Sequence, residues 1–172
     1  MDLIVFSKDR AAQLNLLLES ITLNSNNLFG EVFVQHTYSD NDYKEGYKIL
    51  YDKYKYINWF QEGEFKHTLL NIVKNCSDLV CFMVDDDIFY RQNDCLPQDI
   101  AYLFDTLDLC SFQLRLGYNL RMENNTDNPT ISFPKILKIN DYLIWNRQNT
   151  RGCFSYWQSL DGGIFRRDVI LE

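Results

Sequence analysis

The sequence lacks any run of about 18 consecutive apolar residues, which is the length that a membrane-spanning helix needs. Its opening, MDLIVFSKDR, has an acidic residue at position 2 and too short an apolar stretch for a secretory signal. The expected location is therefore the cytoplasm. A basic excess is also absent, since the net charge is -7 at pH 7, and this disfavours duplex nucleic acid as a partner.

The chain has few residues of the kinds that form disulfides or bind soft metals. Its five cysteines are an odd number without a C-x-x-C pair, and most lie in apolar runs. We expect them to be reduced side chains that pack in the interior. The two histidines, His36 and His67, do not have the spacing of metal ligands and are expected to be structural or on the surface.

What the sequence does contain is the composition of a globular protein, with 46% hydrophobic and 24% charged residues among 172. That length predicts one domain over residues 1–170. The last two residues, Leu171 and Glu172, match a common scar between a cloned segment and a purification tag, which suggests that the chain was trimmed there.

Strand and helix patterns alternate along the chain. Helical spacing of apolar residues follows each of the first strands, as in Leu14, Leu17, Leu18 and Ile21, and Pro97 is well placed to open another helix. The polar stretch 121–135 is the longest predicted loop. This alternation predicts an α/β fold with an open, mainly parallel sheet flanked by helices. The predicted strands are 2–6, 31–37, 57–61, 79–84, 111–118 and 141–146.

Three aspartates, Asp85, Asp86 and Asp87, directly follow the apolar strand LVCFMV. Ligands of open α/β sheets bind beyond the carboxyl ends of the strands, where the polar segments SKDR (7–10) and TYSD (37–40) are also expected. Such a triplet can simply end a strand in a solvated turn or cap the next helix. At the end of a buried strand, however, three adjacent carboxylates need a compensating positive charge.

A divalent cation would supply that charge, and oxygen ligands favour Mg²⁺ or Mn²⁺. In an extended segment Asp85 and Asp87 would point the same way and share one metal and phosphate site. The sequence thus predicts a cofactor, Mn²⁺ or Mg²⁺, bound by this pair.

An apolar strand followed by Asp-x-Asp resembles the metal-binding motif of nucleotide-sugar glycosyltransferases with the GT-A fold, and the order of features resembles glycosyltransferase family 2. The matching segments are VFSKDR, HTYSD, GEFKHTLLN and LDGGIFRRDVI. The resemblance implies metal-dependent transfer of a sugar from a UDP- or GDP-sugar to the hydroxyl of a carbohydrate acceptor, with inversion. The family's usual Asp-Asp pair after the second strand is absent here.

The resemblance also assigns roles to individual residues. Asp87 would bind the metal directly, and Asp85 would face the ribose and the metal's waters. Asp161 would replace the family's missing catalytic base, because the two glycines after it would let the backbone approach a ligand closely. The nucleotide-sugar would be bordered by Ser7, Asp9, Arg10, Asp40, Lys66, Asp85 and Asp86.

Two other functions remain open at this point. Asp-x-Asp at a strand end also serves metal-dependent phosphohydrolases and phosphotransferases, although the dehalogenase pattern expects a Thr where Phe89 stands. A catalytically silent domain that binds sugar nucleotides is the second alternative, since no clear catalytic base is present.

Overall fold

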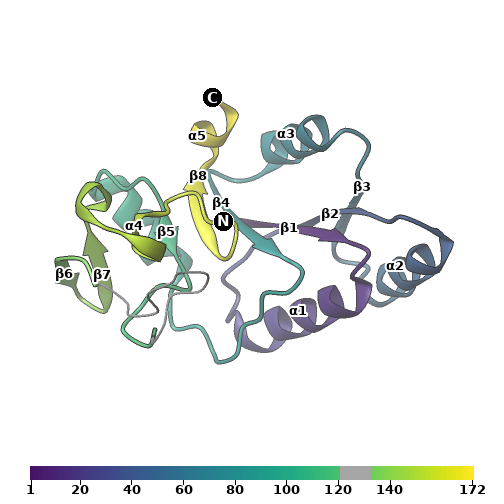
Figure 1. The fold of residues 1–172 in the computed structure, drawn as a ribbon, viewed down its shortest axis with the longest axis horizontal. Helices are drawn as coiled ribbons and strands as arrows, with labels where there is room; N and C mark the ends of the chain where they lie inside the picture. Colours follow the sequence, from purple (N-terminus) through teal and green to yellow (C-terminus); the bar gives the residue numbers. More distant parts are fainter. Residues whose placement is uncertain (121–132) are drawn as a thin grey trace.

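The computed structural model describes residues 1–120 and 133–172, and it has an α/β architecture built on one large sheet (Figure 1). The sheet has six strands in the order β3-β2-β1-β4-β8-β5. Strands β3, β2, β1 and β4 run parallel to one another, whereas β8 is antiparallel to both β4 and β5. The predicted open, mainly parallel sheet is confirmed.

The central strands are β1 (Asp2–Lys8), β2 (Val32–Thr37) and β4 (Leu79–Val84), and their side chains are buried almost throughout. Strand β3 (Asn58–Gln61) lies at one edge. A strand that is apolar on both faces must be covered on both sides. In the parallel register Phe6 lies opposite Val84 and Lys8 lies opposite Thr37, so the carboxyl ends of β1, β2 and β4 meet at one edge of the sheet.

Helices cover both faces of this sheet. The larger core joins one face to α1 (Ala11–Asn24), α2 (Asn41–Lys53) and α4 (Pro97–Thr106), and it includes Leu17, Tyr47 and Phe104. The smaller core joins the other face to α3 (Phe65–Asn75) and α5 (Arg167–Leu171). Figure 1 shows α1 and α2 on one side of the sheet and α3 and α5 on the other.

The last third of the chain differs most from the prediction. Instead of a strand over 111–118, β5 comprises only Phe112–Gln113, and the strand β8 (Gly163–Arg166) was not predicted. The predicted strand at 141–146 is β7 (Tyr142–Trp145), which pairs with β6 (Ile136–Ile139) in a separate hairpin. Two short 3-10 helices follow, Arg147–Asn149 and Gly152–Ser155. Nearly all of the stretch 121–135 that was predicted as a loop lies outside the described residues.

The expectation for the histidines is confirmed, whereas that for the cysteines is confirmed only in part, since Cys95 and Cys153 are half-buried. Cys76 and Cys81 are buried in the core, but Cys110 is exposed, so that part of the expectation is wrong. His36 is buried and His67 is exposed. In the part of the chain that the structure describes, no helix is long and apolar enough to cross a membrane.

Candidate functional site

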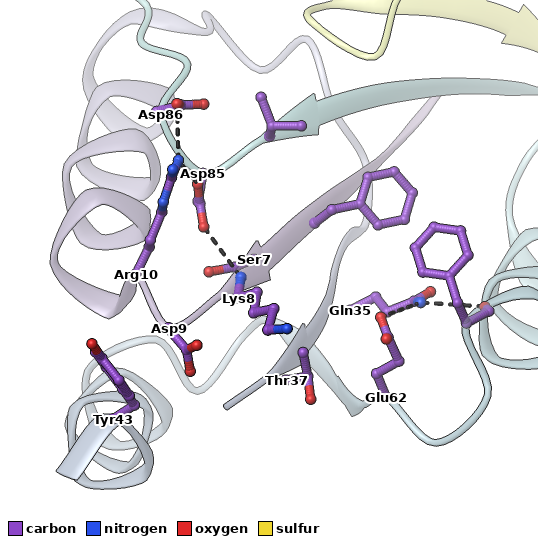
Figure 2. Close-up of a pocket in the computed structure, with 13 residues that line it drawn as sticks. Ser7, Lys8, Asp9, Arg10, Gln35, Thr37, Tyr43, Glu62, Asp85 and Asp86 are labelled. Carbon is purple, nitrogen blue, oxygen red and sulfur yellow. Dashed lines mark hydrogen bonds and ion pairs between the residues drawn. The ribbon is translucent and has the colours of Figure 1, made fainter. Parts of the chain in front are cut away.

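A cavity of about 760 Å³ opens where the ends of β1, β2 and β4 meet (Figure 2). It lies at the edge where ligands of open α/β sheets bind. Segments from three separate strand ends converge there, as the sequence predicted. The side chains that line the cavity include Ser7, Lys8, Asp9, Arg10, Gln35, Thr37, Tyr43, Glu62, Phe65, Asp85 and Asp86.

The loop after β1 is fixed from two sides. The hydroxyls of Ser7 and Tyr47 lie 2.7 Å apart, and the same tyrosine oxygen accepts a hydrogen bond from the backbone nitrogen of Arg10 at 3.3 Å. Asp9 has a positive φ of 58°, and its carboxylate accepts hydrogen bonds from the nitrogen and hydroxyl of Ser39, both at 2.6 Å. The hydrogen bond from the Ser39 hydroxyl lowers the pKa of Asp9. The Asp9 carboxylate thus joins the loop after β1 to the loop after β2.

Arg10 supplies the positive charge beside the first two aspartates. Its Nη1 lies 3.4 Å from Asp85 Oδ1 and 3.0 Å from Asp86 Oδ2. Asp85 is only 5% exposed, and its Oδ2 also accepts a hydrogen bond from the backbone nitrogen of Lys8. The negative charge of Asp85 is the main reason that the pKa of Arg10 is raised. A side chain of the protein therefore provides part of the compensation that the sequence assigned to a metal.

Asp87 points away from this cavity, which corrects one prediction. Strand β4 ends at Val84, and the chain then turns: the backbone nitrogen of Asp87 donates to the oxygen of Val84, and the nitrogen of Val84 donates to Asp87 Oδ2 at 3.1 Å. The segment is not extended, so the expectation that Asp85 and Asp87 face the same way is wrong. Asp87 instead lines a second cavity of about 920 Å³, together with Arg115, Asp161 and other residues.

The electrostatic setting of Asp87 differs from that of Asp85. Burial raises the pKa of the Asp87 carboxyl to about 6, and the negative charges of Asp161 and Asp86 act in the same direction. Arg115 opposes this rise but does not cancel it. Arg10 pairs with Asp85 and Asp86, so Asp87 is the aspartate of the three whose negative charge is least compensated by a nearby positive charge.

Asp161 reaches the same region because β8 is antiparallel to β4. The start of β8 lies at the carboxyl end of β4, where Gly162 donates a backbone hydrogen bond to the oxygen of Phe82 at 2.9 Å. The carboxylate of Asp161 lies 3.6 Å from Arg115 Nε and 3.3 Å from the Ser159 hydroxyl. Asp161 thus faces the second cavity with Asp87 while Arg115 orients its carboxylate.

The two glycines after Asp161 serve the protein's own packing. Gly162 has a φ of +78°, and a Cβ at Gly163 would overlap the backbone oxygen of Ser159 and approach the ring of Phe165. Close approach of a backbone is indeed the reason for glycine here. The approaching group in the structure is Ser159, whereas the sequence suggested a ligand.

The structure does not bring two of the predicted nucleotide-binding residues into the cavity. Asp40 caps α2 by accepting hydrogen bonds from the nitrogens of Asp42 and Tyr43. Lys66 is exposed in the first turn of α3, beside Phe65, which does line the cavity. Sequence reasoning missed Gln35 and Glu62, whereas Thr37 belongs to the segment TYSD that was expected at this edge.

Among the described residues no group of three or more His, Cys, Asp and Glu side chains could hold a metal by itself. Mg²⁺ commonly uses only one or two carboxylates and takes its other ligands from waters and phosphates. The pair that fits this pattern is Asp87 and Asp161, which line one cavity, and the negative charge of Asp161 helps to raise the pKa of Asp87. Both oxygens of Asp85 are occupied by Lys8 and Arg10.

Comparison with known proteins agrees with this fold. No family model matches the chain. The chain is 30% identical over 177 aligned positions to a protein of Dictyostelium discoideum named bifunctional glycosyltransferase pgtA, covering 90% of this chain and 22% of pgtA. The crystal structure of residues 1–349 of S. aureus TarS superposes with a TM-score of 0.57 at 16% identity, over 99% of this chain and 48% of that one.

These likenesses define the class of fold. The chain has a glycosyltransferase fold of the GT-A type, as the resemblance in its sequence implied. It spans about a fifth of the length of pgtA and about half of the solved TarS chain.

Proposed function

We propose that this chain is the donor-binding part of a metal-dependent glycosyltransferase that transfers a sugar from a nucleoside-diphosphate sugar to an acceptor hydroxyl. The observation that carries the proposal is the meeting of the 7–10 loop and the 85–87 turn at one edge of a GT-A sheet, with a cavity on either side of the turn. The similarity to pgtA, a protein named as a glycosyltransferase, supports the same activity.

The first cavity has the chemistry to bind a nucleoside diphosphate. Lys8 and Arg10 bring positive charge to its mouth, and Arg10 is about half exposed and so open to a phosphate. Ser7 and Asp9 hold the loop that carries both cations. The buried carboxylate of Asp85 fixes Arg10 in place by an ion pair before the ligand arrives. Such positioned charges stabilise bound phosphates without further reorganisation.

A divalent cation, Mn²⁺ or Mg²⁺, would be held by Asp87, with Asp161 as a second carboxylate. When bound, it would neutralise the charge that develops on the leaving diphosphate. The raised pKa of Asp87, about 6, supports this assignment, because a cation would favour the ionised form that burial disfavours.

Asp161 is the candidate for the general base in an inverting transfer. It lies at the edge of the second cavity, and its side chain is 46% exposed, so an acceptor hydroxyl can approach it. The carboxylate would take the proton of that hydroxyl as the oxygen attacks the sugar. Arg115 and Ser159 hold the carboxylate in one orientation.

The test is to incubate the protein with UDP-, GDP-, CDP- and dTDP-sugars and Mn²⁺ and to measure release of nucleoside diphosphate. We expect release from one donor class, loss of release with a chelator, and loss in Asp87→Asn. Asp78→Asn is the matched control, because Asp78 is 92% exposed, pairs with Arg167 and precedes β4, at the opposite end of that strand from the 85–87 turn. Release of inorganic phosphate instead would favour a phosphohydrolase, and binding without turnover would favour a silent binding domain.

A further inference from the structure

The first cavity has a second end, away from Arg10 and the aspartates, that the proposed reaction does not use. Gln35 and Glu62 line it (Figure 2), and Phe65 lies beside them, since its backbone oxygen accepts a hydrogen bond from Gln35. They come from β2, from the residue after β3 and from the start of α3. Figure 2 shows Glu62 and Gln35 side by side there, with Thr37 and Lys8 between them and the loop that carries Asp9.

Gln35 carries an amide at a core position, and only 1% of the residue is exposed. Its Nε2 donates to Glu62 Oε2 at 3.0 Å and to the backbone oxygen of Phe65 at 3.3 Å. Both of its donors are therefore used to hold the carboxylate of Glu62 and the start of α3. Its Oε1 is buried and has no hydrogen-bond partner among the described residues.

A buried acceptor without a partner destabilises a fold, and its presence needs an explanation. Next to it stands Glu62, which can only accept hydrogen bonds when ionised. Gln35 Nε2 uses only part of the acceptor capacity of Oε2, so both oxygens of the half-buried Glu62 carboxylate can still accept a hydrogen bond. This end of the cavity therefore offers two acceptors to a ligand, the two oxygens of Glu62, and Gln35, whose Oε1 is closed to solvent, holds that carboxylate in place.

The neighbouring wall is aromatic, and its two rings are tilted by 36°. The rings of Phe6 and Phe65 lie 5.4 Å apart between centroids, and both residues line the cavity. Phe65 is 47% exposed, so its ring is open to a planar ligand. An aromatic wall beside fixed hydrogen-bonding groups is a common way to bind a nucleobase.

We infer that this end of the cavity selects a guanine base, so that the donor is a guanosine-diphosphate sugar. This inference rests on the proposed function. Guanine presents two adjacent donors, N1–H and the 2-amino group, and a carboxylate can accept from both. Uracil presents a single N–H between two carbonyl oxygens, which the carboxylate of Glu62 would repel. In cytosine and adenine the amino group lies next to a ring acceptor, which would face the second acceptor of the site.

The experiment is calorimetric titration of the whole chain with GDP, inosine diphosphate, UDP, CDP and ADP in the presence of Mn²⁺. We expect GDP to bind at least about tenfold more tightly than UDP, CDP or ADP, the scale of one good pair of base contacts. Inosine diphosphate, which lacks only the 2-amino group, should bind with an affinity between those of GDP and UDP.

The matched variants are Glu62→Gln and Glu45→Gln. Both remove one negative charge, but Glu45 is exposed on α2 and pairs with Lys48. Glu62→Gln should weaken binding of GDP about tenfold or more and strengthen binding of UDP, because the repulsion of the uracil carbonyl oxygens is removed. Glu45→Gln should change neither affinity. A thermal unfolding scan of each variant checks that it is folded.

Equal or tighter binding of UDP by the unaltered chain would overturn the inference and leave the proposed function intact. The inference would also be overturned if a folded Glu62→Gln variant lost the same factor of affinity for every nucleotide. Failure of every nucleoside diphosphate to bind the folded chain would instead refute the proposed function, and the inference with it. The comparison of GDP with inosine diphosphate needs no variant and stands even if Glu62→Gln fails to fold.

Discussion

The hydroxyl of Tyr47 in α2 lies 2.7 Å from the hydroxyl of Ser7 in β1, and both side chains are buried. Because the same tyrosine oxygen also accepts from the backbone nitrogen of Arg10, one phenol joins the end of a strand to the start of α1. Arg10 can reach Asp85 and Asp86 only while that loop is held. The position of the cavity's main cation thus depends on a residue that does not line the cavity.

Tyr47→Phe is therefore expected to weaken binding of a nucleoside diphosphate several-fold while it costs about 1 kcal/mol of stability, the usual scale of one hydrogen bond. Titration of the nucleotide and thermal unfolding measure the two effects. Tyr51→Phe is the control, because the Tyr51 hydroxyl contacts His36 and not the loop. If both variants weaken nucleotide binding equally, Tyr47 does not position the loop.

Asp161→Asn is expected to lower kcat by roughly 100-fold or more and to leave donor binding nearly unchanged, the pattern of a lost general base. Steady-state kinetics over donor and acceptor concentrations separate the two effects. Asp168→Asn is a suitable control, since Asp168 lies at the start of α5. An unchanged kcat in Asp161→Asn would mean that another carboxylate accepts the proton.

Burial lowers the pKa of His36 to about 4, so this histidine is neutral in the folded protein at neutral pH. An unfolded chain has a histidine pKa of about 6.5 and takes up the proton first as the pH falls. The contribution of His36 to stability is therefore complete above pH 6.5 and is lost as the pH falls towards 4, by up to about 3 kcal/mol.

Chemical denaturation at several pH values checks this. His36→Gln should remove most of that loss of stability between pH 6.5 and 4, although it also costs the contact with Tyr51 at every pH. His67→Gln, at an exposed position, should keep the pH dependence of the unaltered chain. A pH dependence that persists in His36→Gln would show that other groups cause it.

Gly163→Ala is expected to destabilise the protein by several kcal/mol, because the new methyl group would overlap the backbone oxygen of Ser159. Gly63→Ala is the matched control, since nothing lies within 4 Å of a Cβ at that position. Thermal unfolding compares the two. A Gly163→Ala variant as stable as the Gly63→Ala variant would mean that the segment before β8 can shift freely.

The first two thirds of the fold follow from hydrophobic periodicity. Apolar runs such as LVCFMV predicted buried strands, and repeats such as Leu14, Leu17 and Leu18 predicted helix faces. Strand β8 escaped prediction because it is only four residues long and begins with Gly163, and glycine is depleted from strands. Its place in the sheet is set by pairing with β4, which is far away in the sequence.

The candidate site was predicted in part. Ser7, Asp9, Arg10, Asp85 and Asp86 line one cavity as expected from their places after strands. The turn at Asp87 could not be foreseen, because an apolar strand followed by acidic residues does not specify where extension stops. Asp40 accepts hydrogen bonds from backbone nitrogens in the first turn of α2, and this capping role takes the place of the predicted role in the site.

The antiparallel pairing of β8 with β4 has a consequence for the solubility of the chain. Without β8, the strand LVCFMV would lie at the edge of the sheet with its backbone groups unpaired. A long apolar edge strand invites pairing with other chains and aggregation. The segment that brings Asp161 to the candidate site thus also shields the strand that precedes the aspartate triplet, so its displacement would endanger solubility as well as the geometry of that site.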